Sequence, residues 1–329
     1  MNQPIDFDKY IQETGNVYLA FYARAAEILG IKHEIIWPSY IIRCYHGDKR
    51  WDVVQSQLPI NSITASIIAQ KKHLTTFVCK KAGLPVPIQS EIHSPEQALE
   101  FYKEHKEVVF KPVKNFGGKG ITLLPRTEEE AKQAYETAYQ EDHSTSLFNV
   151  LGEKFFTGSN YRLLVLDGKV LAVAERIPAK VIGDGVNTIE QLIIHSNEER
   201  VRQKIHRIKI DQEMYKKLQN DGVTMQDIPH NGEEVILRYN SNLSTGGTTR
   251  ECTQSTHDYY KQVAINAVKA VGLKLSGVDL IVEDITKEGP CIINELNDAP
   301  GLNIHYKPTE GEVLDVAIPI MEYVRENAF

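Results

Sequence analysis

Two kinds of hydrophobic spacing alternate along this chain of 329 residues. Apolar residues recur at helical spacing and predict helices at residues 17–30, 63–82, 188–196, 210–220, 256–271 and 312–325. Short apolar runs bounded by turn residues predict strands at residues 31–36, 40–44, 108–113, 121–124, 150–156, 161–166, 170–176, 234–238, 277–282 and 291–296. Hairpins with flanking helices are typical of α+β lobes with largely antiparallel sheets, which is the fold class that we expect.

Cap and turn residues set several of these boundaries. Ser94 precedes a proline and is followed three residues later by Gln97, which is a capping box and predicts the start of a helix. Thr127 followed by three glutamates predicts another start of the same kind. Asp167 and Gly168 between two apolar runs predict a tight type I′ hairpin.

The elements fall into three regions. Residues 1–60 form a short α/β segment, too short for a complete doubly wound domain. Residues 61–156 combine helices with strands around a Gly-rich turn, and residues 157–329 are richer in strands. This length allows two or three lobes, each with its own core.

The composition excludes several classes of function. Hydrophobic residues make up 42% and charged residues 25%, as in average globular proteins. The net charge of −7 argues against a nucleic-acid partner, because such domains carry clustered Lys and Arg. The sequence shows no signal peptide and no apolar run near the roughly 20 residues that span a bilayer. Four widely separated cysteines are typical of reduced thiols, so we expect a cytoplasmic protein without a membrane partner.

Oxygen ligands gather at the ends of two late strands. Glu295 and Asn297 lie two residues apart on an apolar run, so they share one face just before a Pro-Gly turn. Asp279 lies on the preceding apolar run. Three hard oxygen donors suit Mg²⁺ held together with substrate phosphates. A polar strand end with solvated side chains explains the spacing equally well.

A lysine and a Gly-rich loop follow the first strand of the middle region. Lys111 ends this strand, where it can serve as a point charge on phosphate or simply extend to water. Residues 115–120 place three glycines around Lys119, and their N–H groups can close over phosphate oxygens. The spacing is not that of a Walker A loop, and a tight hairpin without a ligand remains an alternative.

Three further segments carry weaker signals. Residues 153–156 end a strand and can offer backbone groups and an aromatic wall to an adenine. Arg162 and Arg176 lie on successive strands, where they can neutralise phosphate or pair with an acid such as Glu175. Residues 242–248 form a small polar loop with two glycines, which can bind an anion or merely turn the chain.

Taken in order along the chain, these motifs resemble the ATP-grasp superfamily, in which two α+β lobes grip ATP. Residues 177–189, 208–210, 242–247 and 305–311 are similar to the ATP-grasp module of cyanophycin synthetase. The synthetase module of bifunctional glutamate–cysteine ligase/glutathione synthetase is similar along the same span. The resemblance covers residues 61–329 and implies an N-terminal lobe at 61–156 with a Gly-rich lid, followed by a C-terminal lobe with the metal and substrate site.

The resemblance also implies a role for each matching residue. ATP would be bound by Lys72, Lys111, Asn115, Gly117, Gly118, Lys119, Gly120, Glu153, Lys154, Phe155 and Phe156. The acyl phosphate would be faced by Arg162, Arg176, Asn242, Gly246 and Gly247. Mg²⁺, or Mn²⁺ in its place, would be held by Asp279, Glu295 and Asn297. The substrate would lie near Arg250 and His305.

The chain departs from its relatives in two places. Thr75-Thr76 stands where a Thr-Lys pair often follows the counterpart of Lys72. After Gly247 the relatives have an acidic turn, whereas this chain has Arg250, which reverses the charge beside the acceptor site. The additional catalytic halves of both relatives are absent from this sequence, so we expect one ligation rather than two.

The resemblance implies an ATP-dependent carboxylate–amine ligase that joins an amino acid or short peptide to an amino acid through an acyl phosphate. A nucleotide-binding module without ligase activity, or a phosphotransferase on the same fold, are the alternatives. The sequence leaves both substrates open, including glutathione-like and aspartyl or arginyl peptide products. A homodimer is expected from the family alone.

Overall fold

The computed structural model describes residues 5–113, 120–142, 149–203 and 205–328. The chain divides into two compact units, of which unit 1 comprises residues 1–173, 252–306 and 313–329. Unit 2 comprises residues 174–251 and 307–312. The three regions expected from the sequence, with boundaries near residues 60 and 156, stay a prediction.

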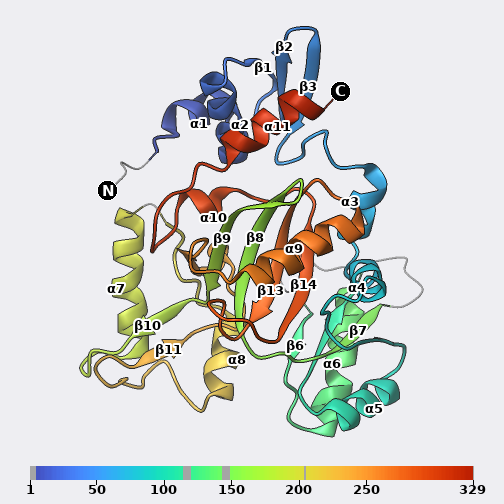
Figure 1. Ribbon diagram of the computed structural model, residues 1–329. Coiled ribbons are helices and arrows are strands. Elements are labelled where there is room, and N and C mark those ends of the chain that lie inside the picture. Colours follow the sequence, from blue (N-terminus) through green and yellow to red (C-terminus); the bar gives the residue numbers. More distant parts are fainter. Residues whose placement is uncertain (1–4, 114–119, 143–148, 204, 329) are drawn as a thin grey trace. The chain divides into compact units, whose positions relative to one another are not determined.

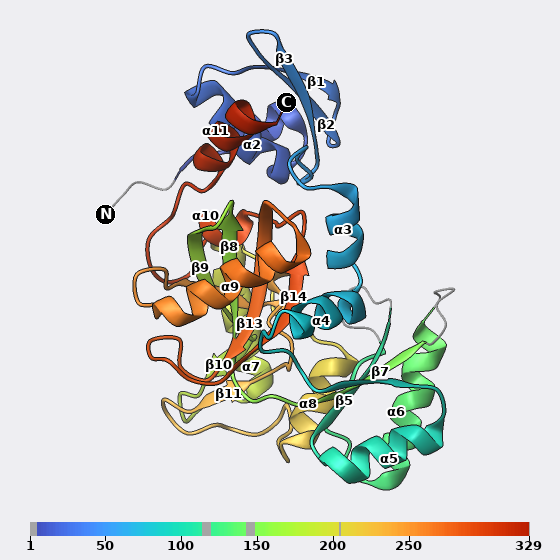
Figure 2. The same ribbon diagram turned by 45° about the vertical axis from the view of Figure 1, so that its right-hand side comes forward.

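The two ends of the chain share a core in unit 1. Its elements are α1 (Asp8–Thr14), α2 (Val17–Ile28), β1 (Lys32–Trp37), β2 (Ile41–His46), β3 (Lys49–Val54) and α11 (Ala317–Asn327). The strands form an antiparallel sheet in the order β1-β2-β3. Phe21 of α2, Ile42 of β2 and Val324 of α11 are buried in one cluster. Figures 1 and 2 both show α11 beside α2, so the last helix completes the core of the first residues.

The helix expected at residues 63–82 is broken into α3 (Ile63–Ala69) and α4 (Lys72–Lys81). Lys71 adopts an extended conformation at the break and serves as the N-cap of α4. The Thr75 hydroxyl donates a hydrogen bond to the Ile68 carbonyl at 3.0 Å, which satisfies an acceptor at the end of α3. The expectation of one continuous helix was therefore wrong, and the break places Lys72 at the start of the second helix.

A four-stranded antiparallel sheet follows in unit 1. Its strands lie in the order β4 (Gln89–Ile92), β7 (Val150–Lys154), β5 (Val108–Pro112) and β6 (Thr122–Leu123). Two helices supply its core, α5 (Pro95–His105) and α6 (Glu128–Glu141). The predicted caps are confirmed, because Ser94 accepts from the Gln97 N–H and Thr127 from the Glu130 N–H. The sequence pattern did not predict β4.

A third antiparallel sheet of unit 1 carries the acidic strands. It pairs β8 (Ser159–Leu166) with β13 (Leu275–Val282), and β13 with β14 (Cys291–Asn297). The helix α9 (Asp258–Val271) packs against it in one core, and the short α10 (Asn303–Tyr306) follows β14. Asp167 and Gly168 both have positive φ, at 43° and 79°, which confirms the predicted hairpin after β8.

Unit 2 has its own small core. Its elements are residues 174–177 of β9 (Lys169–Ile177), β10 (Lys180–Ile182), α7 (Ile189–Arg202), α8 (Gln212–Asn220), β11 (Glu234–Ile236), η1 (Leu243–Thr245) and β12 (Thr248–Glu251). The strand β12 pairs antiparallel with the end of β9, and β10 with β11. Ile189, Ile193, Met214 and Leu237 are buried together.

Across the part of the chain that the structure describes, no helix is both long and apolar enough to cross a membrane.

Candidate active site

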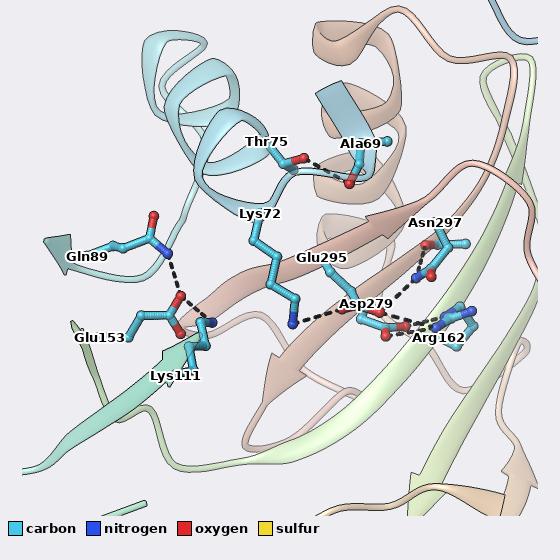
Figure 3. A network of polar contacts seen from close by, with 11 residues as sticks. Ala69, Lys72, Thr75, Gln89, Lys111, Glu153, Arg162, Asp279, Glu295 and Asn297 are labelled. Atoms are coloured by element: carbon cyan, nitrogen blue, oxygen red, sulfur yellow. Dashed lines mark hydrogen bonds and ion pairs between the residues drawn. The ribbon is translucent and has the colours of Figure 1, made fainter. Parts of the chain in front are cut away.

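The three expected metal ligands lie together on β13 and β14 in unit 1. Asp279 is opposite Glu295, and Gly277 is opposite Asn297, with a bulge after Asp279. The Asn297 side-chain amide donates to Glu295 Oε1 at 3.1 Å, as Figure 3 shows. Two carboxylates and one side-chain amide thus lie together on the paired strands β13 and β14. Among the described residues, no group of three or more His, Cys, Asp or Glu is arranged to hold a metal ion.

Arg162 of β8 is directly opposite Asp279 of the neighbouring strand β13, and the two side chains form an ion pair. Its guanidinium binds both carboxylate oxygens, with one hydrogen bond of 2.8 Å from NH2 to Oδ2 and a second from Nε to Oδ1. Burial lowers the pKa of Arg162, but the Asp279 carboxylate outweighs this effect and raises it, so the guanidinium stays charged. A Cβ on Gly277 would lie 2.7 Å from Arg162 Cδ, so the glycine leaves the space in which the arginine lies.

Lys72 binds the other acid of this cluster. Its Nζ lies 3.1 Å from Glu295 Oε2, and Arg162 NH2 lies 4.0 Å from Oε1 of the same carboxylate. Burial alone would raise the pKa of Glu295, but Lys72 and Arg162 outweigh it and lower the pKa to about 2. Burial lowers the pKa of Lys72, whereas Glu295 and two further acids raise it above its ordinary value. Both groups are therefore charged at neutral pH.

A second ion pair lies on β5 and β7. Lys111 binds Glu153, and Gln89 of β4 donates to the same carboxylate at 2.6 Å (Figure 3). Both charged side chains are buried, and burial lowers the pKa of Lys111 against the opposing effect of Glu153. The Gln89 contact was not foreseen, because no pattern in the sequence indicated β4. A lysine at this depth is stabilised by its acid and is available to a competing anion.

The structure describes only some of the remaining residues that are expected to bind the nucleotide. Backbone N–H groups of Lys154 and Phe155 donate to carbonyls of Ile88 and Glu107, both at distances under 3.0 Å. Gly120 has a φ of +69°, which favours glycine. Asn115, Gly117, Gly118 and Lys119 lie outside the described residues.

The cluster in unit 1 is balanced in charge. Its cations are Lys72, Lys111 and Arg162, and its acids are Glu153, Asp279 and Glu295. Lys72 also interacts electrostatically with Glu153 and Asp279, so the two ion-pair groups form one electrostatic network. Such a network can exchange its internal pairs for a polyanion and a cation of comparable total charge.

His305 of α10 is buried in the same unit. Its side chain is 2% exposed, and its Nδ1 meets no hydrogen-bond partner among the described residues. Burial and the charge of Arg162 lower the pKa of His305 to about 3, so the imidazole is neutral. A neutral, unpaired ring nitrogen can accept or donate one hydrogen bond to a ligand.

The expected substrate and acyl-phosphate residues of unit 2 lie on β9, β12 and the loop before β12. Arg250 is opposite Glu175 and binds its carboxylate. Its NH1 also lies 3.9 Å from Glu310 Oε2. Thr249 is opposite Arg176, which is half-buried. The alternative that pairs Arg162 or Arg176 with an acid is met by Arg162, which binds Asp279, whereas Glu175 binds Arg250, an arginine that the alternative did not include.

The loop at residues 242–247 contains one short turn in unit 2. Leu243–Thr245 form one 3-10 turn, and the Thr245 hydroxyl donates to the Asn242 carbonyl at 3.0 Å. Gly246 ends the turn with a φ of +100°, and a Cβ there would lie 2.6 Å from Ile208 Cα. A Cβ on Gly247 would lie 2.8 Å from a backbone carbonyl oxygen. Both glycines are therefore required by close backbone approach.

The sheets of unit 1 and the order of the motifs resemble an ATP-grasp fold, and comparisons with known proteins agree. The family model described as "Prokaryotic glutathione synthetase, ATP-grasp domain" matches residues 86–236. The model described as "RimK-like ATP-grasp domain" matches residues 218–324. The two matches together extend from the strands of the four-stranded sheet to α11.

Individual relatives are more specific. A cyanophycin synthetase of Crocosphaera subtropica is 37% identical over 273 residues, which are 80% of this chain and 31% of the relative. The glutathione biosynthesis bifunctional protein of Clostridium perfringens is 35% identical over 266 residues, 77% of this chain and 33% of the relative. The crystal structure of a bifunctional glutathione synthetase from Pasteurella multocida matches with a TM-score of 0.67 and 29% identity. That match covers 93% of this chain and 44% of the other.

These similarities confirm the expected α+β class, the ATP-grasp fold and the resemblance to both kinds of synthetase. The chain spans about a third of the length of the curated relatives that it matches. The role of each site residue stays a prediction.

Proposed function

We propose that the chain is an ATP-dependent ligase that forms an amide bond between a carboxylate and an amino-acid amine. The observation that carries the proposal is the partly buried network of Lys72, Lys111 and Arg162 with three acids and Asn297. Its order along the sequence matches the ATP-grasp motifs, and the relatives are synthetases. In the proposed reaction, a carboxylate oxygen attacks the γ-phosphate of ATP to give an acyl phosphate and ADP. An amine then displaces phosphate and loses a proton to form the amide.

The cations of the network have separable tasks in this reaction. Lys72 and Lys111 would exchange their carboxylate partners for phosphate oxygens of ATP, because a phosphate offers the same charge-assisted hydrogen bonds. Arg162 would balance the charge that moves to the acyl phosphate while Asp279 holds its guanidinium in place. Phosphoryl transfer needs mainly positioning and charge neutralisation, which this arrangement can supply.

The acids suit Mg²⁺ by the chemistry of their donors. Asp279, Glu295 and Asn297 present hard oxygen atoms on paired strands, and we propose that they would hold Mg²⁺ or Mn²⁺. When bound, the metal would neutralise phosphate charge. Lys72 and Arg162 already keep the Glu295 carboxylate ionised, with a pKa of about 2, so it needs no deprotonation before it binds a cation.

The resemblance suggests roles for the loops as well. We propose that residues 115–120 cover the phosphates and exclude water, because an acyl phosphate hydrolyses readily. The Asn242–Gly247 loop, Arg176, Arg250 and the neutral His305 are proposed to serve the acyl phosphate and the substrates. The proposed substrates are amino acids or short peptides, with γ-glutamyl and aspartyl carboxylates as the first choices. A cytoplasmic location and a homodimer complete the proposal.

The test is ADP release by the purified chain over a panel of γ-glutamyl and aspartyl carboxylates, each with and without a set of amino acids. Mass spectrometry identifies the products. The proposal expects an amide whose formation requires both ATP and the amine. A phosphorylated product formed without the amine would make the chain a phosphotransferase. Tight nucleotide binding without any product across the panel would favour a binding module.

Glu295→Ala serves as the site control. We expect this variant to fold and to lose ADP formation, because it removes one of the two carboxylates of the metal set. Turnover like that of the original chain would refute the assignment of the metal site.

A further inference from the structure

We propose that Asn61 is a positioning residue that fixes the exit of β14, where Glu295 and Asn297 lie. Asn61 belongs to the segment that joins the N-terminal sheet to α4, and this segment lies outside both matched family models. The inference rests on the proposed metal and nucleotide site, and it adds a part of the chain to which no motif pointed.

The Asn61 side chain uses its full hydrogen-bonding capacity. Its Nδ2 donates to the Leu275 carbonyl at 2.8 Å and to the Asp298 carbonyl at 2.9 Å. Its Oδ1 accepts from the N–H groups of Lys274 at 2.8 Å and Leu275 at 3.1 Å. A side-chain amide has two donor hydrogens and two acceptor positions, so all four are occupied. Because hydrogen bonds are directional, these four bonds fix both the position and the orientation of the side-chain amide.

These four bonds lie where the pairing between β13 and β14 ends. The strands β13 and β14 are last paired at Gly277 and Asn297, so the next residues of each strand have no partner across the ladder. Asn61 fills this position by binding Leu275 through both its N–H and its carbonyl, and it then reaches the carbonyl of Asp298. The side chain thus joins the first residue of β13 to the residue that follows Asn297.

Two neighbouring contacts hold the same exit. The buried Ser276 hydroxyl donates to the Asn297 carbonyl at 3.0 Å. The Asp298 carboxylate accepts from the side-chain amides of Gln57 and Gln70, each at 3.3 Å. Two residues after Gln70, Lys72 binds Glu295. Residues 57–72 therefore contact β14 and its exit four times, at a sequence separation of more than 220 residues.

The position of Asn297 matters because its side chain also orients Glu295. The Asn297 amide donates to Glu295 Oε1, so two of the three proposed metal ligands, Glu295 and Asn297, move with the end of β14. Residues that orient metal ligands typically change metal affinity or activity by about 10–100-fold when they are replaced. We therefore expect Asn61 to act on the metal-dependent part of nucleotide binding.

The test compares Asn61→Asp and Asn61→Ala with the matched control Asn16→Asp. Aspartate at position 61 keeps the acceptor for Lys274 and Leu275 but loses both donors, including the one to Asp298. Asn16 also bridges two segments, since its side chain donates to the Ser39 carbonyl at 2.9 Å and accepts from the Tyr18 N–H at 2.7 Å. Within the described part of the chain, the hydrogen bonds of Asn16 stay among residues 14–39 of the N-terminal elements.

Two measurements are made on the full chain. Calorimetry gives the affinity for a non-hydrolysable ATP analogue with and without Mg²⁺, and hydrogen exchange followed by mass spectrometry reports on residues 273–277 and 295–299. We expect both Asn61 variants to lose about 10–100-fold in affinity with Mg²⁺ and to change little without it. Exchange should become faster at both strand ends, and Asn16→Asp should match the original chain in both measurements.

Unchanged Mg²⁺-dependent affinity in folded Asn61→Asp would overturn the inference, and so would an equal loss with and without Mg²⁺, which indicates general destabilisation. Failure of the proposed function is recognised separately. If the original chain binds the analogue but makes no amide, the ligase proposal fails while the positioning role stands. If it binds no nucleotide, unchanged exchange in Asn61→Asp would overturn the inference on its own.

Discussion

Gly277→Ala is expected to disturb the site through one methyl group. Gly277 lies on β13 without a left-handed backbone, so alanine is conformationally acceptable there. The new Cβ would lie 2.7 Å from Arg162 Cδ, 3.0 Å from Arg162 NH1 and 3.1 Å from Pro300 Cβ. Arg162 cannot yield easily, because two of its guanidinium nitrogens, Nε and NH2, are bound to Asp279. The methyl group of alanine would therefore overlap atoms that cannot move away easily.

The magnitude follows from the cost of overpacking a well-packed interior, which is about 1–3 kcal/mol. A loss of 1 kcal/mol lowers the melting temperature of a unit of this size by about 2–4 °C. Gly289→Ala is the matched control, since its Cβ would lie 3.4 Å from the nearest heavy atom, the Tyr260 hydroxyl oxygen. We expect this control to change stability by less than about 0.5 kcal/mol.

Thermal unfolding of four proteins shows how much of the stability lost in Gly277→Ala comes from the contact between the new methyl group and Arg162. The set comprises the original chain, Gly277→Ala, Arg162→Ala and the double variant. In the Arg162→Ala background the methyl group meets a vacated space, so Gly277→Ala should lose most of its cost. A coupling of about 1 kcal/mol or more is expected. An equal cost of Gly277→Ala in both backgrounds would refute the reasoning.

Three further outcomes follow from the structure. Arg238 is fully buried between two partly exposed carboxylates, so Arg238→Met should destabilise unit 2 by about 1–3 kcal/mol in thermal unfolding, while the exposed Arg202→Met should stay within about 0.5 kcal/mol. The pKa of Glu295 is lowered from its ordinary 4.5 to about 2, so its stabilisation relative to Glu295→Gln should be full above pH 4.5 and disappear as the pH falls towards 2; a pH-independent difference in melting temperature would contradict this. Burial raises the pKa of Cys79 and Cys291 to about 11, so alkylation at pH 8 should require unfolding, and rapid labelling of the native chain would contradict their burial.

Local signals allowed much of the fold to be predicted. Ser94 and Thr127 cap helices as expected, and Asp167-Gly168 turns the hairpin, because each feature depends on a few adjacent residues. The break before Lys72 was missed because neither glycine nor proline marks it. It depends on a hydrogen bond from Thr75 back to the preceding helix.

The candidate site shows the same division. Strand alternation placed Glu295 and Asn297 on one face, and the structure has them in contact. The sequence could not indicate that Arg162 binds Asp279, since this pair depends on the register of β8 and β13 across 117 residues. Asn61 gave no local signal at all, because its four partners are backbone groups far along the chain.

The central claim is that an acyl phosphate forms at this site, and trapping with hydroxylamine tests it most directly. The chain is incubated with ATP, Mg²⁺ and each carboxylate of the panel, and hydroxylamine replaces the amine substrate. Hydroxylamine displaces phosphate from an acyl phosphate to give a stable hydroxamate, which mass spectrometry identifies. The account predicts one hydroxamate per ADP formed with an accepted carboxylate, and its loss in Glu295→Ala. ADP formed with an accepted carboxylate but without hydroxamate, or a hydroxamate that persists in Glu295→Ala, would contradict the account.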